Sequence, residues 1–497
     1  MSYTSLFEEK KWSVYLMLFV LFFGSYGYFF QGGGWNQNIR ICLTRAIIHH
    51  GTFTVDQYKE DSKEMEFVNA GDWAFYNGHY YCNKSPGLSF LALPSFALSE
   101  YCLKHLLPDD PERQVLFSSY FSNLCTTALM SSLLVLLIFH VFYHFFQMGF
   151  SNSLLLTLFF GLGTLTLPYS TAFYCHLPAA FFSFLSFVLA MHIRHGHSQR
   201  KRVSALLAGF SAGSAVLIEP SSVYIGIGVF IYLLSFQEGR RHAALFVIGG
   251  IPPGLVQGWY NFVCFGHPLA LSYNYANEMV MSKVNEKLFG IPSLAQLNWL
   301  LLSPYRGLLF LSPVFLMVLP GMVFFFKKKE WRAEAVTSVC ISLCFIFFIA
   351  GFYGIVSATP PRYLLPAFPF FFLLAGLSLC KYPKLFKIVG VISILINLSI
   401  TLVGIEIPWR LRVPLVVVAF KNIIAGKISI NPVPISQFNS YPSIYELANI
   451  ETWTPNFNSF NLGEIAFPHS VASIVPLVCF WVIWGYWWKK STVRKQD

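Results

Sequence analysis

The segments QGGGWNQNIRICLTRAIIHHGTFTVDQY (residues 31–58) and GDWAFYNGHYYCNKSPG (residues 71–87) carry most of the polar chemistry of this sequence. They lie between one apolar run at residues 12–30 and another at residues 86–107. A connection of this length is far longer than the few residues that join two neighbouring helices. We therefore interpret residues 31–114 as a functional loop, and the apolar remainder of the chain as the scaffold that holds it.

The composition of the chain indicates a membrane protein. Of its 497 residues, 55% are hydrophobic and only 11% are charged, whereas soluble proteins average about 45 to 50% apolar and about 25% charged residues. The net charge is +11, but the basic residues stand in short clusters between apolar runs, as in the cytoplasmic loops of membrane proteins. No separate basic and aromatic module that could bind nucleic acid is present. We predict an integral, multi-pass, all-α membrane protein with no nucleic-acid partner.

About twelve apolar runs are long enough to cross a bilayer as helices. They are residues 12–30, 115–140, 153–168, 177–193, 203–218, 221–236, 243–264, 306–326, 334–355, 363–380, 385–404 and 469–488. The first run is expected to be an uncleaved span rather than a signal peptide, because its apolar core is long and no small-residue cleavage site follows it.

The run at residues 86–107 is predicted to lie in the plane of the membrane, or to re-enter it, rather than to cross. It contains Pro94, Glu100 and Lys104, and a charge at the centre of a lipid-exposed helix costs about 3 kcal/mol. If this run does not cross, five later basic clusters all fall in the cytoplasm. These are residues 194–202, 237–242, 327–332, 381–387 and 489–495. Residues 1–404 are then expected to form a transmembrane domain that carries the loop of residues 31–114 on its outer side, and residues 405–497 an outer segment followed by a final span.

A short amphipathic helix is predicted inside the loop. Ile39 and Leu43 stand at helical spacing, Asn36 or Asn38 can cap the start, and Gly51 can end the helix. We expect this helix to lie on the membrane surface.

Six ionisable residues from distant parts of the chain fall on one side of the membrane in this topology, at or just beyond helix ends. They are Asp56, Asp72, Lys84, His176, Glu219 and Arg362. Glu219 is the most informative, because a carboxylate near membrane depth is usually paired or functional. His176 could equally be a packed residue at the membrane edge, and Arg362 could be a structural clamp on outer carbonyl groups.

Six segments, taken in order, resemble a known group of enzymes. They are NQNIR (residues 36–40), LTRAIIHHGTFTVDQY (43–58), GHYYCNKSPGLSFLALP (78–94), YNFVCFGHPLALSY (260–273), SPYRGLLFLSPVF (303–315) and PPRYLLPAFP (360–369). Together they are similar to segments of the bacterial polytopic glycosyltransferases of the GT-C fold, a group that includes protein O-mannosyltransferases and the lipid A aminoarabinose transferase. The likeness spans most of residues 12–380.

The resemblance implies transfer of a sugar from a polyprenyl phosphate donor to a lipid, glycan or protein acceptor, at the outer face of a bacterial inner membrane. An inverting transfer needs a carboxylate that takes the proton of the acceptor and cations that hold the leaving phosphate. The resemblance implies Lys84, in the motif KSPG, as a ligand of the donor phosphate, and we expect Arg362 and Arg40 to join it. The residues expected to contact the substrates are Asn36, Asn38, His79, Tyr81, His176, Glu219 and Tyr273. No residue is assigned to a metal, and assistance by a divalent cation is left open.

The chain departs from this group at one place. Many members carry an acidic pair early in the first loop, where this chain has Asn36, Gln37 and Asn38. The catalytic base is therefore expected at Asp56 or Asp72. We favour Asp56, because it follows the loop helix in an extended stretch that can direct a carboxylate over the bundle, whereas a turn at Asp72 would more readily solvate its side chain.

Two other classes of function remain open on the sequence. A transporter or a flippase for lipid-linked sugars also has many spans and intramembrane charges, but its binding groups gather at broken helices near the midplane. Here the polar groups gather at one face. A non-catalytic partner in the assembly of envelope glycans is the third alternative, and it would account for the missing acidic pair.

Overall fold

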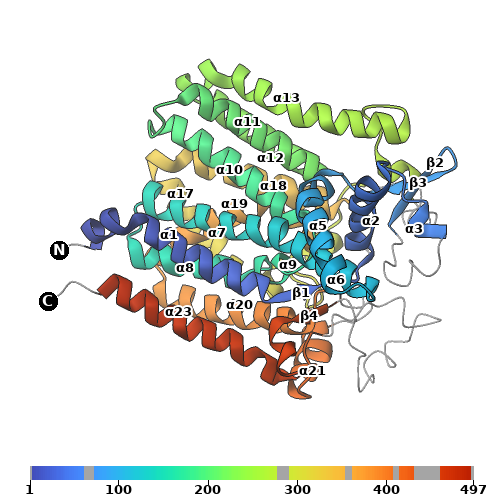
Figure 1. Ribbon diagram of the computed structural model, residues 1–497. Coiled ribbons are helices and arrows are strands. Elements are labelled where there is room, and N and C mark those ends of the chain that lie inside the picture. Colours follow the sequence, from blue (N-terminus) through green and yellow to red (C-terminus); the bar gives the residue numbers. More distant parts are fainter. Residues whose placement is uncertain are drawn as a thin grey trace.

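The chain folds into a bundle of long, roughly parallel and antiparallel helices (Figure 1). The computed structural model describes residues 3–60, 72–276, 290–352, 361–406, 413–429, 459–468 and 470–493. The helices of the bundle are α1 (Tyr3–Gly27), α7 (Leu129–His140), α8 (Phe150–Gly163), α10 (His176–Arg194), α11 (Lys201–Ile218), α12 (Val223–Leu234), α13 (Gln237–Phe265), α17 (Val318–Lys327), α18 (Arg332–Ala350), α19 (Phe368–Gly376), α20 (Pro383–Val403) and α23 (Val475–Val493).

Shorter helices and four strands complete the described part of the chain. The helices are α2 (Trp35–His50), α3 (Gln57–Glu60), α5 (Gly87–Leu106), α6 (Pro111–Asn123), α9 (Thr166–Ser170), α15 (Leu294–Leu301), α16 (Leu308–Leu311) and α21 (Lys421–Ile424). The strands are β1 (Phe29–Gln31), β2 (Trp73–Tyr76), β3 (His79–Cys82) and β4 (Ser459–Asn461). All four strands lie at the same end of the bundle, with α2, α3, α5 and α6 (Figure 1).

The described residues contain seven helical stretches that are long and apolar enough to cross a membrane. They are Pro111–Phe145, His176–Arg194, Lys201–Ile218, Lys329–Ala350, Arg362–Cys380, Pro383–Val403 and Val471–Lys490. Five shorter apolar helices accompany them, namely Trp12–Gly27, Phe150–Gly163, Pro220–Leu234, Pro313–Lys327 and Leu415–Ile424. Every predicted span coincides with one of these stretches except residues 243–264, which lie within α13. The chain is an integral, multi-pass membrane protein, and the number of twelve crossings stays a prediction.

Aromatic rings pack at many places in the interior of the bundle. Phe372 of α19, for example, meets Phe142 at a ring-centroid distance of 6.0 Å and Phe160 at 5.2 Å, both in edge-to-face geometry. Such pairs add about 0.5 to 1.5 kcal/mol each beyond the area that they bury. The high phenylalanine content therefore serves packing between helices as well as contact with lipid.

The helices α2 and α5 stand across one end of the bundle, transverse to its long helices (Figure 1). Within the described residues, α5 is in neither group of apolar stretches, and this orientation agrees with the in-plane course predicted for residues 86–107. The prediction for α2 was wrong in one respect. Residues 36–46 are all buried, so the helix is enclosed by protein and does not lie on the membrane surface. Its N-cap is Gly34, and neither Asn36 nor Asn38 holds that position.

The hairpin of β2 and β3 brings together the residues that precede β2 and those that follow β3. Asn77 and Gly78 form its turn with φ values of 50° and 86°, as a two-residue turn of type I′ requires. The register pairs Trp73 with Cys82. Because Asp72 and Lys84 lie just beyond this pair, the hairpin brings them to the same place.

A second strand pair connects the first loop to the C-terminal part of the chain. Strand β1 pairs with β4 in antiparallel register, with Phe29 opposite Asn461 and Gln31 opposite Ser459. Helix α23 also packs on α1, where the indole Nε1 of Trp481 donates to Ser25 Oγ at 2.9 Å. Strand β4 and helix α23 are thus joined to the end of α1.

Candidate active site

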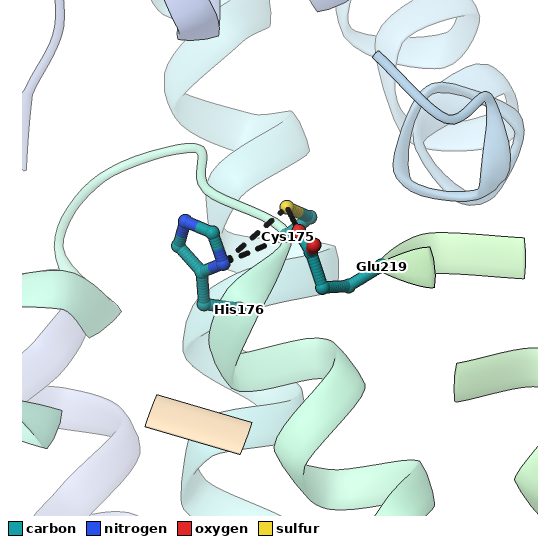
Figure 2. Close-up of side chains that lie close together, drawn as sticks. All are labelled: Cys175, His176 and Glu219. Atoms are coloured by element: carbon teal, nitrogen blue, oxygen red, sulfur yellow. Dashed lines mark hydrogen bonds and ion pairs between the residues drawn. The ribbon is translucent and has the colours of Figure 1, made fainter. Parts of the chain in front are cut away.

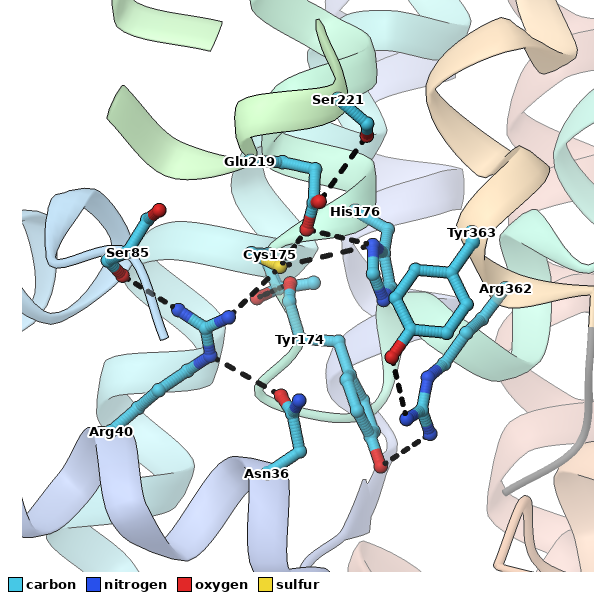
Figure 3. A network of polar contacts seen from close by, with 11 residues as sticks. Asn36, Arg40, Ser85, Tyr174, Cys175, His176, Glu219, Ser221, Arg362 and Tyr363 are labelled. Carbon is cyan, nitrogen blue, oxygen red and sulfur yellow. Dashed lines mark hydrogen bonds and ion pairs between the residues drawn. The ribbon is translucent and has the colours of Figure 1, made fainter. Parts of the chain in front are cut away.

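Helix α2 places Arg40 at the centre of a buried polar network. The helix ends at Gly51, which has a φ of 63°. Within it, Arg40 Nε donates to Asn36 Oδ1 one turn earlier at 3.3 Å. The other guanidinium nitrogens donate to Ser85 O at 2.9 Å and to Cys175 Sγ at 3.1 Å. With 2% of its surface exposed, Arg40 joins the first loop to the start of α10 (Figure 3).

Lys84 is a second buried cation of the first loop, besides Arg40. Its Nζ is 3.3 Å from Asp72 Oδ2, with side-chain exposures of 7% for Lys84 and 18% for Asp72, and it lies 5.1 Å from the centre of the Tyr273 ring. Burial alone would lower the pKa of the Lys84 ammonium, but the charge of Asp72, with smaller effects of Tyr273 and Tyr363, raises it overall. Lys84 is therefore protonated at neutral pH.

The glycine of the KSPG motif permits a close approach between two helices. A Cβ atom on Gly87 would lie 2.6 Å from the carbonyl oxygen of Leu217 and 2.8 Å from the amide nitrogen of Ile218. Contacts this short are not tolerated, so only glycine lets the start of α5 pack on the end of α11. This packing holds the segment that follows Lys84 against the end of α11, which Glu219 directly follows.

Asp56 is bound to the hairpin. Its Oδ2 lies 2.7 Å from His79 Nδ1, and its Oδ1 accepts from the backbone N–H of Tyr80 at 2.6 Å. Tyr81 packs its ring against Phe265 at 5.5 Å. Both carboxylate oxygens of Asp56 therefore have partners on β3, whereas Asp72 faces Lys84.

Three neighbouring side chains form a compact group, in which Cys175 and His176 are buried and Glu219 is partly buried (Figure 2). Glu219 Oε2 accepts from Cys175 Sγ at 2.9 Å and lies 3.3 Å from His176 Nδ1, while Oε1 accepts from Ser221 Oγ at 3.2 Å. Burial would raise the pKa of Glu219, but hydrogen bonds from His176 and Cys175 and the charge of Arg40 lower it to about 2. Burial also raises the pKa of the Cys175 thiol, so a protonated thiol donates to an ionised carboxylate.

In the described part of the chain, these three residues are also a group of possible metal ligands. Their sulfur, nitrogen and oxygen donor atoms lie within 4.8 Å of one another. Sulfur, imidazole nitrogen and carboxylate oxygen are all ligands of Zn²⁺. However, Arg40 already donates to the sulfur at 3.1 Å, which places a positive charge where a cation would bind. The group fits an internal hydrogen-bond network better than a metal, and we derive no step through an ion.

A second group surrounds Arg362. Its guanidinium donates to Tyr174 Oη and to Tyr363 Oη, both at 3.4 Å, and lies 5.1 Å from the centre of each ring (Figure 3). The Tyr174 hydroxyl donates in turn to Glu406 Oε1. Burial raises the pKa of Glu406, and Arg362 and Tyr174 oppose that rise only in part. A Cβ atom on Gly34 would lie 2.5 Å from Glu406 Oε1, so the glycines before α2 leave room for this carboxylate.

Most of the predicted site residues therefore converge on one buried centre. Tyr273 connects its parts, because Lys84, Glu219 and Asp72 are all close enough for their charges to act on the pKa of its hydroxyl. The residues that meet here are Asn36, Arg40, Asp72, Lys84, His176, Glu219, Tyr273 and Arg362. Asp56, His79 and Tyr81 belong instead to the hairpin, and Asn38 donates to Gly33 O at the start of α2 at 3.4 Å.

Tyr174, Cys175 and Glu406 are members of this centre that the sequence analysis did not predict. Glu406 directly follows an apolar run, and the same signal had identified Glu219. Nothing in the sequence distinguishes Tyr174 or Cys175 from other residues at helix ends.

No family model matches this sequence, and no curated protein matches it. Among solved structures, ArnT from Cupriavidus metallidurans bound to undecaprenyl phosphate aligns with a TM-score of 0.51 at 15% identity, over 79% of this chain and 63% of that protein. AglB from Archaeoglobus fulgidus, an archaeal oligosaccharyltransferase in complex with an inhibitory peptide and a dolichol-phosphate, aligns with a TM-score of 0.43 at 12% identity, over 80% of this chain and 55% of that protein. The chain thus spans less than two thirds of the length of either. The likeness to ArnT confirms the predicted GT-C fold.

Proposed function

We propose that this protein is a membrane glycosyltransferase that moves a sugar from a polyprenyl phosphate donor to a lipid, glycan or protein acceptor. The observation that carries the proposal is the buried centre at one end of an apolar bundle, which holds three cations beside three carboxyl groups. Its cations are Lys84, Arg40 and Arg362, and its carboxyl groups are Asp72, Glu219 and Glu406.

The pairing of these groups supports a phosphate site near Arg362. Asp72 pairs with Lys84 at 3.3 Å, and ionised Glu219 lies near Arg40. Burial raises the pKa of Glu406, so this carboxyl group balances the charge of Arg362 less strongly than Asp72 balances that of Lys84. Among the described residues, Arg362 Nε is buried and has no hydrogen-bond partner. A phosphate oxygen would satisfy that N–H group, and charge-assisted contacts of this kind are the strong ones.

The proposed reaction is a direct displacement at the anomeric carbon of the sugar. A carboxylate accepts the proton of the acceptor hydroxyl as the acceptor oxygen bonds to the anomeric carbon. The bond between that carbon and the phosphate oxygen breaks, and its electron pair stays on the phosphate. Lys84 and Arg362 stabilise the leaving phosphate, which is the role of preorganised cations where negative charge develops.

We propose Asp72 as the base, which reverses the preference drawn from the sequence. The carboxylate of Asp72 lies beside Lys84, so it is adjacent to the proposed phosphate site. Both oxygens of Asp56 are held by β3, and this arrangement suits a residue that positions the hairpin. The fold of ArnT, which was solved with undecaprenyl phosphate, supports a polyprenyl phosphate as the lipid carrier. We further propose that the site faces the outer side of a bacterial inner membrane.

The test is turnover of defined donors by the purified full-length protein. The protein in lipid nanodiscs is incubated with a panel of labelled polyprenyl phosphate sugars, and loss of label from the donor is followed. We expect release of sugar from at least one donor, and a large loss of this activity in Arg362→Lys. Folded protein that binds polyprenyl phosphate but turns over no donor would favour the non-catalytic assembly partner. Movement of intact donor across the membrane, without transfer, would favour a flippase.

A further inference from the structure

Five of the thirteen histidines of the chain gather at the end of the bundle opposite the buried polar centre. They are His140 at the end of α7, His144 in the π-helical segment Val141–Phe145, His192 in α10, and His195 and His197 just after it. His176 begins α10 and belongs to the polar centre, whereas His192 stands sixteen positions later, roughly 24 Å along the helix. The histidine cluster is therefore separate from the proposed active site.

The two central imidazoles face each other through the same ring nitrogen. His140 Nε2 lies 3.3 Å from His192 Nε2. Two nitrogens bonded to one tetrahedral Zn²⁺ ion at 2.0 to 2.1 Å stand about 3.3 Å apart. The opposite nitrogen of His140, Nδ1, is 3.0 Å from the hydroxyl of Tyr15. An oxygen at that position can fix the tautomer and orientation of a metal-bound imidazole.

Further imidazoles flank this pair. The ring of His144 lies 4.7 Å from that of His140, and the ring of His197 lies 5.8 Å from that of His192. In the described part of the chain, however, neither ring brings a nitrogen within 4.8 Å of both central Nε2 atoms. The π-helical segment that carries His144 is a local irregularity of a kind that is frequent at functional sites.

The charges around the cluster compensate one another. His195 Nε2 lies 2.8 Å from Glu334, whose side chain is fully buried. Arg194 is 3.6 Å from the same carboxylate, and the Tyr232 hydroxyl donates to it at 2.5 Å. Glu334 thus balances Arg194 and occupies Nε2 of His195, so we do not count His195 among the ligands.

We propose that His140 and His192 are two ligands of a divalent transition-metal site of the Zn²⁺ type, whose remaining positions are open to water. Imidazole suits Zn²⁺, Cu²⁺ and Ni²⁺. Such an ion would link the ends of α7 and α10. Because Tyr15 of α1 contacts His140, it would also link α1 to them. The site is independent of the proposed transfer reaction.

The test measures metal binding to full-length protein purified without a histidine tag. Metal-free protein is titrated with Zn²⁺, and bound metal is counted by elemental analysis. We expect one Zn²⁺ per chain, and affinity at least tenfold weaker in His140→Ala/His192→Ala. The matched control is His105→Ala/His267→Ala, which removes two exposed histidines elsewhere and should bind as wild type does.

Two further measurements keep the proposal open to refutation. Co²⁺ bound to the wild-type protein should give the absorption of a tetrahedral site with nitrogen ligands and no thiolate-to-metal band, even if the double variant fails to fold. Zn²⁺ binding should survive in Cys175→Ser. Loss of binding in Cys175→Ser would assign the ion to the Cys175, His176 and Glu219 group and overturn the proposal. Absence of Zn²⁺ binding to the wild-type protein would also overturn the proposal. The contact between the two Nε2 atoms would then be only a shared proton.

Discussion

Replacing Lys84 with methionine should disable transfer far more than it disturbs the fold. Methionine keeps an unbranched side chain beside the Tyr273 ring and removes only the ammonium charge. That ammonium is 7% exposed and 3.3 Å from Asp72. In the proposed reaction it also contacts the leaving phosphate, so the substitution removes a buried, charge-assisted interaction from the transition state.

The magnitude follows from the burial of the pair. Truncation of one partner of a buried, charged hydrogen bond costs about 2 to 5 kcal/mol, and loss of 2 to 4 kcal/mol from the transition state lowers kcat/KM about 30- to 1,000-fold. The free energy of unfolding should fall by less than the 3 to 5 kcal/mol seen for fully buried pairs, because Asp72 retains 18% exposure and can be solvated. We expect a loss of about 1 to 2 kcal/mol.

The assay compares donor turnover and thermal unfolding in three variants. The matched control is Lys104→Met, which removes a lysine that is 57% exposed and 3.8 Å from Glu100, and it should keep nearly full activity. The double variant Lys84→Met/Asp72→Asn removes both charges of the buried pair, so it should recover stability but not activity. A loss below threefold in Lys84→Met, or recovery of turnover in the double variant, would show that Lys84 merely neutralises Asp72.

Three further predictions test the base, the buried carboxylate and the topology. Asp72→Asn should lower turnover by about two to four decades, and Asp56→Asn by less than tenfold; the opposite order, measured in the same donor assay, would return the base to Asp56. Because the pKa of Glu219 falls from 4.5 to about 2 on folding, its ionised form should contribute about 3 kcal/mol of stability above pH 4.5 that is lost as the pH falls toward 2. Melting temperatures between pH 6 and 3 should therefore decline more steeply in the wild type than in Glu219→Gln, and equal slopes would contradict the assignment. In a background that lacks exposed cysteines, a cysteine at Asp109 should react with an impermeant reagent from outside and one at Gln199 should not; the reverse would invert the topology.

The sequence by itself determined that this is a multi-pass membrane protein of the GT-C fold, and it singled out most of the polar residues that the structure brings together. The length and apolarity of each run are local properties, and eleven predicted spans coincide with apolar helical stretches of the structure. The end of α2 at Gly51 was also predictable, because glycine readily adopts the left-handed conformation found there. The charged residues of the KSPG and PPRYL motifs stood out for the same local reason, since charges are rare beside apolar runs.

Only the tertiary structure decided how these residues are partnered. The apolar spacing of α2 predicted a helix, but burial on all sides depends on α5 and on the loops that cover it, and no periodicity within α2 records them. The preference for Asp56 was drawn without the hairpin register, which pairs Trp73 with Cys82 and brings Asp72 to Lys84; the choice between the two carboxylates stays a proposal. Glu406 reaches Tyr174 across 232 positions of sequence. Burial, pairing and pKa depend on neighbours that the fold brings together from distant segments, and these neighbours were fixed only when the helices packed.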